Sequence, residues 1–144
     1  MKSGAKQRKF QIKMDSMKKF LKRAVIILLA GLVVAIAAFV LWANDAYPPG
    51  APALQALNSD ARVEVKLEGG VYTFTPVEVK PVVGFIFYPG GRVDYRAYAP
   101  VLRMIAESGY FVALTPAPLN LAFFDVNAAA RVQAEHPEIQ TWAV

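Results

Sequence analysis

A run of 20 residues without a single charge, Ala24 to Ala43, constrains this chain more than any other feature of its sequence. Only Gly31 in this run falls outside the apolar class. At about 1.5 Å of rise per residue, a helix of this length spans roughly 30 Å, the thickness of the hydrocarbon core of a bilayer. A helix on the surface of a globular domain keeps a polar stripe, which this run lacks. The run therefore predicts one transmembrane helix over residues 24–43.

The charges on the two sides of this run predict its orientation. Residues 1–23 contain nine Lys or Arg against the single acid Asp15, whereas the part after the run contains seven basic and ten acidic residues. Under the positive-inside rule we expect a cytoplasmic N-terminus and an extracytoplasmic domain. A cleaved signal peptide is the alternative, but its apolar region is about 7 to 15 residues long, and no A-x-A site follows Trp42 at the right place.

The basic segment, residues 1–23, is amphipathic if it is helical. One helical face carries the apolar residues Phe10, Met14, Met17 and Leu21, and lysines occupy the opposite face. This pattern suits a helix on anionic lipid, although a topogenic flank with no partner of its own is the simplest interpretation. Nucleic-acid binding needs a motif or stacking aromatics beside the basic residues, and neither is present. We therefore expect the lipid bilayer, and no nucleic acid, among the partners.

The sequence contains few residues that could bind a metal or carry out thiol chemistry. The absence of cysteine excludes disulfides, thiolate catalysis and Cys-ligated metals within these 144 residues. The one histidine, His136, precedes Pro137, where a helix is expected to end. A histidine in a last helical turn is stabilised by the helix dipole, and we predict this role rather than metal ligation. We expect no metal and no cofactor.

After the apolar run the sequence predicts a linker and then a β-hairpin. The two prolines at positions 48 and 49 favour extended backbone, so residues 44–52 are predicted to be a short stiff linker. Apolar and charged residues alternate from Val63 to Glu68, and Val71 to Thr75 forms a second strand-like segment. Gly69 and Gly70 between them are typical of a two-residue hairpin turn.

The remaining sequence predicts parallel βα units. Val82–Tyr88 and Tyr110–Thr115 are nearly continuous apolar runs, as in strands buried on both faces. A helix is predicted between them, with Pro100 in its first turn and Gly109 just past its end. A second helix is predicted from an N-cap at Asn120 to about His136, and a third strand begins at Trp142. Because the chain ends at Val144, we expect the sheet to be incomplete and the chain to be the front of a longer protein.

This order of elements resembles the N-terminal half of an α/β-hydrolase of the membrane-anchored bacterial type. The resemblance covers about residues 53–144, and five segments carry it: Tyr88–Gly91, Arg92–Tyr98, Gly109–Val112, Pro118–Leu121 and His136–Trp142. It implies an incomplete α/β-hydrolase sheet, with a hairpin followed by parallel βα units, preceded by one transmembrane helix. It also implies hydrolysis of ester or other acyl substrates by a Ser-His-acid triad.

The triad itself cannot be carried over to this sequence. In the family the nucleophilic serine follows the strand that begins here at Trp142, in a Gly-x-Ser-x-Gly turn. None of the serines lies in such a motif: Ser3, Ser16, Ser59 and Ser108. His136 precedes the nucleophile strand and is not the catalytic histidine. We therefore expect these residues alone to be inactive.

One element of the site can be carried over. The family takes one backbone N–H of its oxyanion hole from the loop after the strand at 82–88, which corresponds to Gly90, Gly91 and Arg92. Glycine leaves room for the developing oxyanion. The alternative is a plain tight turn, in which Gly91 would be needed for a left-handed φ. Asp94 and Arg96 follow in the same loop. Their side chains either lie near the substrate or are simply solvated.

Two other classes of function remain open. One is a membrane-anchored, non-catalytic interaction domain that uses the same sheet, because a fold does not guarantee a chemistry. The other is a degraded coding fragment. The residues encoded after Val144 distinguish both from a hydrolase.

Overall fold

The computed structural model describes the backbone of residues 3–144 and the side chains of residues 13, 14 and 16–144. The chain divides into two units, Met1–Leu41 and Trp42–Val144, and each is described by itself. Phe10, part of the predicted apolar face of the basic segment, lies outside the described side chains, whereas Met17 and Leu21 are exposed.

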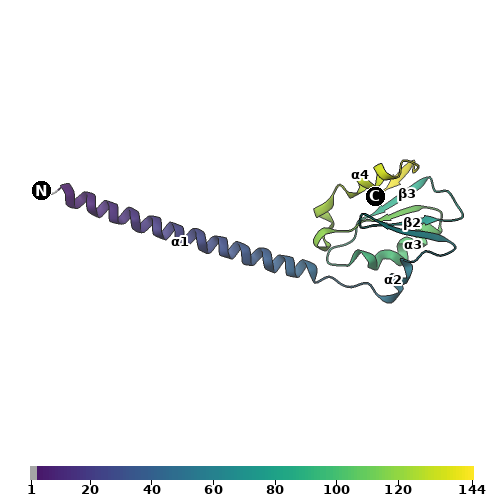
Figure 1. The fold of residues 1–144 in the computed structure, drawn as a ribbon, viewed down its shortest axis with the longest axis horizontal. Helices are drawn as coiled ribbons and strands as arrows, with labels where there is room; N and C mark the ends of the chain where they lie inside the picture. Colours follow the sequence, from purple (N-terminus) through teal and green to yellow (C-terminus); the bar gives the residue numbers. More distant parts are fainter. Residues whose placement is uncertain (1–2) are drawn as a thin grey trace. The chain divides into compact units, whose positions relative to one another are not determined.

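The first unit consists of helix α1 (Ser3–Asn44), whose last turn belongs to the second unit (Figure 1). This one helix covers both the predicted basic segment and the predicted membrane-spanning run. Its part from Ser16 to Asn44 is long and apolar enough to cross a membrane, and the most apolar 18 residues within it have a mean hydropathy of 3.2. A signal sequence meets the same criteria of length and composition, so the helix alone does not distinguish an anchor from a signal peptide.

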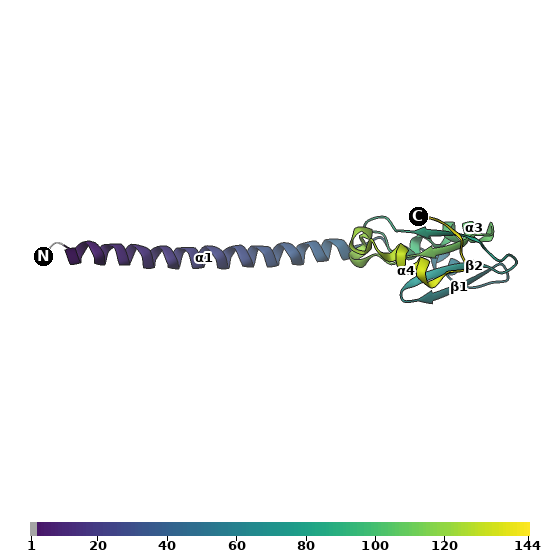
Figure 2. The ribbon, with the colours of Figure 1, turned by 90° about the horizontal axis from the view of Figure 1, so that it is seen from above.

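The second unit is built on one mixed five-stranded sheet. Its strands are β1 (Val63–Glu68), β2 (Val71–Pro76), β3 (Val83–Phe87), β4 (Phe111–Leu114) and β5 (Thr141–Ala143), in the spatial order β1-β2-β4-β3-β5. Strands β1, β2 and β4 pair antiparallel, whereas β4, β3 and β5 pair parallel. The hairpin β1–β2 forms one edge of the sheet (Figure 2). The predicted fold class, a hairpin followed by parallel βα units, is confirmed.

The hairpin turn and the strand lengths follow directly from the sequence pattern. Gly69 and Gly70 have φ of 56° and 86°, the left-handed values that a tight turn between two strands requires. All four residues of β4 are buried, in keeping with a central strand. In β3 only Gly84 and Ile86 are buried. Gly84 is the packing site of β5, because a Cβ there would overlap the indole ring of Trp142.

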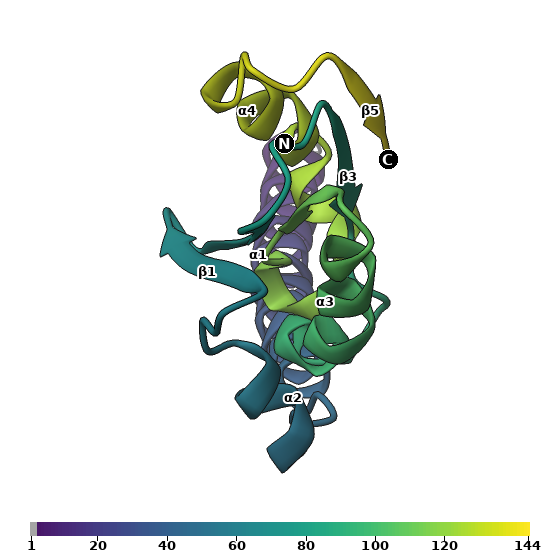
Figure 3. The same cartoon turned by 90° about the vertical axis from the view of Figure 1, so that its right-hand side faces the viewer.

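Helices cover both faces of the sheet and give it two cores. On one face α2 (Ala51–Ala56) and α3 (Ala99–Glu107) pack over a cluster that includes Phe74, Leu102, Val112 and Leu114. On the other face α4 (Ala128–Glu135) packs over Ile86, Phe111, Ala113, Val132 and Ile139. Figure 3 shows α3 and α4 on different sides of β3. Gly109, with φ of 99°, ends α3 as predicted.

The predicted helix from Asn120 to His136 is wrong at its beginning. Residues 118–125 form two short 3₁₀ turns instead, η2 (Pro118–Asn120) and η3 (Ala122–Asp125), and α4 starts only at Ala128. Asn120 has φ of 53°, which is incompatible with an N-cap, and its side chain bonds elsewhere. A similar turn, η1 (Tyr95–Tyr98), leads into α3.

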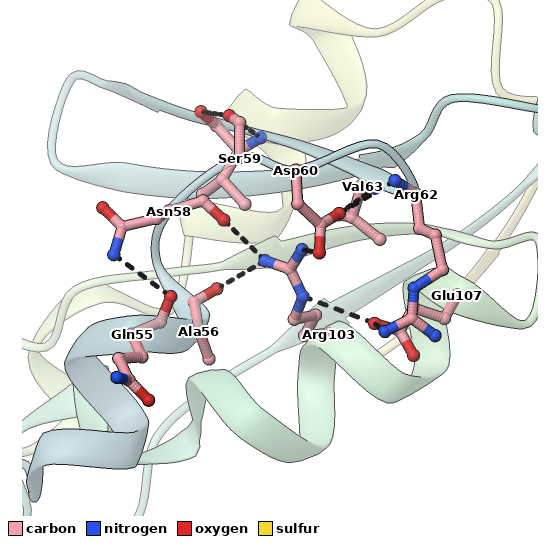
Figure 4. A network of polar contacts seen from close by, with 10 residues as sticks. Gln55, Ala56, Asn58, Ser59, Asp60, Arg62, Val63, Arg103 and Glu107 are labelled. Atoms are coloured by element: carbon pink, nitrogen blue, oxygen red, sulfur yellow. Dashed lines mark hydrogen bonds and ion pairs between the residues drawn. The ribbon is translucent and has the colours of Figure 1, made fainter.

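A network around Arg103 joins α3 to the segment between α2 and β1 (Figure 4). Nη1 of Arg103 donates to the carbonyls of Ala56 and Asn58, at 3.1 and 2.6 Å. Its Nη2 lies 2.6 Å from Oδ2 of Asp60, and its Nε lies 3.4 Å from Oε1 of Glu107. The N–H groups of Arg62 and Val63 donate to the other oxygen of Asp60. These bonds, followed by the ion pair with Arg103, lower the pKa of the Asp60 carboxyl.

Candidate functional site

The candidate site is the loop after β3, and both of its flanks are held in place. At the end of β3 the carbonyl of Phe87 accepts from the N–H and the hydroxyl of Thr115, at 3.2 and 3.0 Å. The next residue, Tyr88, accepts at its hydroxyl from the N–H of Ala129 at 2.7 Å and donates to the carbonyl of Val126 at 3.3 Å. The loop is therefore fixed to both β4 and the start of α4.

Gly90 is a glycine because a tyrosine hydroxyl approaches its backbone. Its N–H donates to Oη of Tyr98 at 3.2 Å, and a Cβ at Gly90 would lie 2.7 Å from the same oxygen. The ring of Tyr98 is itself held against Phe87, with 4.8 Å between the ring centroids. The N–H of Gly90 therefore already has a hydrogen-bond acceptor in the hydroxyl of Tyr98.

The three candidate N–H groups of the loop differ in their partners. The N–H of Arg92 donates to the carbonyl of Asn120 at 2.9 Å, so this group is used as well. The N–H of Gly91 has no hydrogen-bond partner within the part of the chain that the structure describes, and Gly91 is exposed. Of the three predicted residues, Gly91 alone keeps an N–H available to a ligand.

Backbone strain is concentrated at this loop. Among the described residues, the non-glycine positions with left-handed φ are Arg92 at 57°, Leu119 at 54° and Asn120 at 53°. The hydrogen bond from Arg92 to Asn120 joins all three into one junction. A left-handed φ costs roughly 1–2 kcal/mol per residue, and such strain is often stored at functional sites. The left-handed residue of the loop is Arg92 and not Gly91, so Gly91 is not a glycine for conformational reasons.

The loop is also bound to the residues that end α1, a contact that the sequence analysis missed. Tyr47 donates its N–H to the carbonyl of Arg92 and accepts at its own carbonyl from the N–H of Asp94, both at 3.0 Å. Asn120 donates its side-chain amide to the carbonyl of Ala43 at 3.1 Å. The predicted linker, residues 44–52, thus contains a short parallel bridge to the loop. Nothing in the Tyr-Pro-Pro-Gly pattern signals this pairing.

The side chain of Arg92 strengthens the same contact. Its Nη2 lies 2.9 Å from the carbonyl of Asp45 and 3.2 Å from Oδ2 of the same residue. The guanidinium carbon lies 4.9 Å from the centroid of the Trp42 ring, a cation–π distance. Nε of Arg92 is buried and has no hydrogen-bond partner within the described residues.

Asp94 and Arg96 pair with each other at the start of η1. Oδ1 of Asp94 accepts from the backbone N–H of Arg96 at 3.0 Å and from its Nε at 2.9 Å, and Oδ2 accepts from Nη2 at 2.6 Å. The side-chain hydrogen bonds from Arg96 lower the pKa of Asp94 despite partial burial. This pair caps the turn that leads from the loop into α3.

His136 lies away from the loop, at the end of α4, as its sequence position predicts. Its Nδ1 is 3.1 Å from Oε1 of Glu138, and its ring lies 4.4 Å from that of Phe111. Among the described residues no group of three His, Cys, Asp or Glu side chains is arranged to hold a metal ion.

Comparison with known proteins gives one match. A family model described as the alpha/beta hydrolase family matches residues 84–144. Residues 84–144 are therefore similar to the alpha/beta hydrolase family. The matched region begins in β3 and includes the candidate loop, both helices α3 and α4, and strands β4 and β5. No curated protein and no solved structure matches the chain significantly.

Proposed function

We propose that these residues are the amino-terminal part of a membrane-anchored serine hydrolase that cleaves ester or other acyl substrates. One observation carries the proposal: in a segment similar to the alpha/beta hydrolase family, the loop after β3 keeps the N–H of Gly91 without a partner. In this fold the loop after the third strand contributes one donor to the oxyanion hole. Such a donor stabilises the negative charge that develops on the carbonyl oxygen during acyl transfer.

The chemistry requires groups that these 144 residues do not contain. A nucleophilic serine, a histidine that takes its proton and an acid that orients the histidine perform acyl transfer in this family. No serine of the chain lies in Gly-x-Ser-x-Gly, and the sequence position expected for that motif follows β5. The proposed role of residues 1–144 is therefore to anchor the enzyme and to supply Gly91, while the triad comes from residues encoded after Val144.

A fluorophosphonate probe, which reacts with activated serines, tests this proposal. The whole protein, as its gene encodes it, is expected to be labelled on a serine after Val144, and heat denaturation should abolish the labelling. Residues 1–144 made alone should show neither labelling nor ester turnover above a denatured control. Labelling of the short chain would contradict the proposal. A whole protein that folds but is not labelled would favour a non-catalytic interaction domain.

The proposed orientation places the domain outside the cytoplasm, on the strength of the basic flank before the apolar run. Glu78 is exposed and lies in the loop between β2 and β3, so Glu78→Cys introduces a single accessible thiol into a segment without cysteine. We expect this thiol to react with a membrane-impermeant maleimide in intact cells whose outer barrier, if present, has been permeabilised. Reaction only after lysis would reverse the orientation.

A further inference from the structure

The candidate loop is joined to the chain at the point where the apolar run ends. Asn120 bonds the carbonyl of Ala43, the last residue of that run, and Arg92 lies over the ring of Trp42. Tyr47, four residues further on, pairs with the backbone of Arg92 and Asp94. If α1 spans the bilayer, Trp42 and Tyr47 occupy the interfacial layer that such aromatic residues prefer. The loop that contains Gly91 then lies at the membrane surface.

The segment beside the loop exposes apolar side chains. Phe123 and Val126 are 64% and 71% exposed, and the ring of Phe124 lies 4.3 Å from that of Phe123. Leu121, the residue before η3, reaches toward the loop, since a Cβ at Gly91 would lie 3.4 Å from its Cδ2. Exposed aromatic and aliphatic side chains of this kind are typical of segments that enter the headgroup region of a bilayer.

Charge does not oppose contact of this segment with lipid. From Phe111 to Phe124 the sequence contains no charged residue. Asp125 is the one charged residue between Pro118 and Asn127, and Nη1 of Arg131 donates to its Oδ1 at 2.9 Å. The side-chain hydrogen bond from Arg131 lowers the pKa of the Asp125 carboxyl.

We propose that residues 119–126 form a membrane-contacting surface beside the candidate site, and that the site takes acyl substrates from the bilayer. The substrate class is an amphiphile whose acyl carbonyl lies at the membrane surface. The substrate part rests on the proposed hydrolase function. The occupant of the surface is lipid because the surface is continuous, through Asn120 and Ala43, with the end of the apolar run. Coverage by a later part of the chain, or by a second copy, is an alternative that the experiment below detects.

Depth-dependent quenching tests the surface without any need for activity. The whole protein, with any cysteine outside these residues replaced, is prepared as single variants Phe123→Cys, Val126→Cys and Met104→Cys, each labelled with a nitrobenzoxadiazole fluorophore. Met104 is the control because it is 66% exposed and lies on α3, outside residues 119–126. In phosphatidylcholine vesicles, doxyl-labelled lipid should quench the labels at 123 and 126 at least threefold more than the label at 104, in accord with interfacial insertion.

Two results would contradict the proposal that residues 119–126 contact the membrane. Equal quenching at 123 and 104 by doxyl lipid, together with quenching of both by aqueous iodide, means that the segment faces water. Shielding of position 123 from both quenchers means that protein covers it.

A rate comparison tests the substrate class. The whole enzyme is assayed with a diacylglycerol-type ester in phosphatidylcholine vesicles and with a soluble short-chain ester. Phe123→Ser should lower the ratio of the vesicle rate to the soluble rate about tenfold, as expected from the loss of an inserted aromatic side chain. Met104→Ser should not change this ratio. An unchanged ratio in Phe123→Ser contradicts a substrate taken from the bilayer. If the unmodified protein hydrolyses neither ester, the hydrolase function itself is contradicted.

Discussion

Two arginines, Arg103 and Arg92, each hold a segment that precedes the sheet against the α/β unit, but they do so in very different ways. The side chain of Arg103 is 12% exposed and interacts with two carbonyls and two carboxylates. The side chain of Arg92 is 31% exposed and has one carboxylate partner, Asp45, which is itself 86% exposed. Arg103 has an ordinary helical backbone, whereas Arg92 has a left-handed one.

The difference indicates which region is optimised for stability. A largely buried guanidinium surrounded by acceptors contributes to the fold, because its removal leaves buried polar groups without partners. Around Arg92 three neighbouring residues have a left-handed backbone, and Gly91 keeps a free N–H within the described part of the chain. Unsatisfied and strained groups of this kind are retained where they serve a site.

The largest effect on stability is expected from Arg103→Ala. This change removes the partner of Asp60 and the donors to two carbonyls, and should lower the free energy of unfolding of the whole protein by about 3 kcal/mol. Chemical denaturation followed by circular dichroism measures the loss. Arg62→Ala is the matched control, because Arg62 pairs with the same Glu107 but is 67% exposed. Its cost should stay below about 0.5 kcal/mol. Equal effects of the two changes would remove the distinction between a structural and an exposed arginine.

A smaller effect is expected at Arg92, as a difference in the free energy of unfolding between two variants. Both Arg92→Ala and Arg92→Gly remove the guanidinium contacts, so the difference between them reports on the backbone alone. Because φ is 57° at this position, the Gly variant should be more stable than the Ala variant by about 1 kcal/mol. The same pair of changes at Arg96, in the turn η1, should show the reverse order. If Gly is not the more stable residue at position 92, the junction is not strained.

The smallest effect concerns pH. The pKa of Asp60 is lowered from its ordinary value of 3.8, chiefly by the N–H groups of Arg62 and Val63. A carboxyl with a lowered pKa in the folded state adds stability above its unfolded pKa, and this stability is lost as the pH falls through the folded pKa. The melting temperature should therefore fall as the pH drops below about 4. Asp60→Asn should show a shallower fall than the unmodified protein. An identical slope would mean that Asp60 does not titrate with unfolding.

Most of the fold could be predicted from the sequence because its signals are local. Glycine pairs, apolar runs and the Pro100 and Gly109 boundaries depend on a few neighbouring residues, and the strands and α3 follow them. The start of α4 could not be predicted, since the strain at Leu119 and Asn120 is imposed by bonds to distant residues. An Asn before an apolar stretch resembles an N-cap in sequence even when its side chain bonds a carbonyl elsewhere.

The candidate site was predictable only in outline. The Pro-Gly-Gly sequence after an apolar strand identified the loop, but it did not distinguish among Gly90, Gly91 and Arg92. That distinction depends on Tyr98 and Asn120, which use two of the three N–H groups. The contact with Asp45 and Tyr47 joins residues more than 40 positions apart, and no spacing rule signals it.

The central claim is that the N–H of Gly91 serves catalysis, and the most direct test is kcat per folded molecule of Gly91→Val in the whole enzyme. A Cβ at this position would meet Cδ2 of Leu121 at 3.4 Å, and φ is not left-handed, so the variant should fold with a melting temperature close to that of the unmodified protein. Crowding of the oxyanion donor should lower kcat by about 10² to 10³, equivalent to about 3–4 kcal/mol. A folded Gly91→Val enzyme with unchanged kcat would contradict the claim.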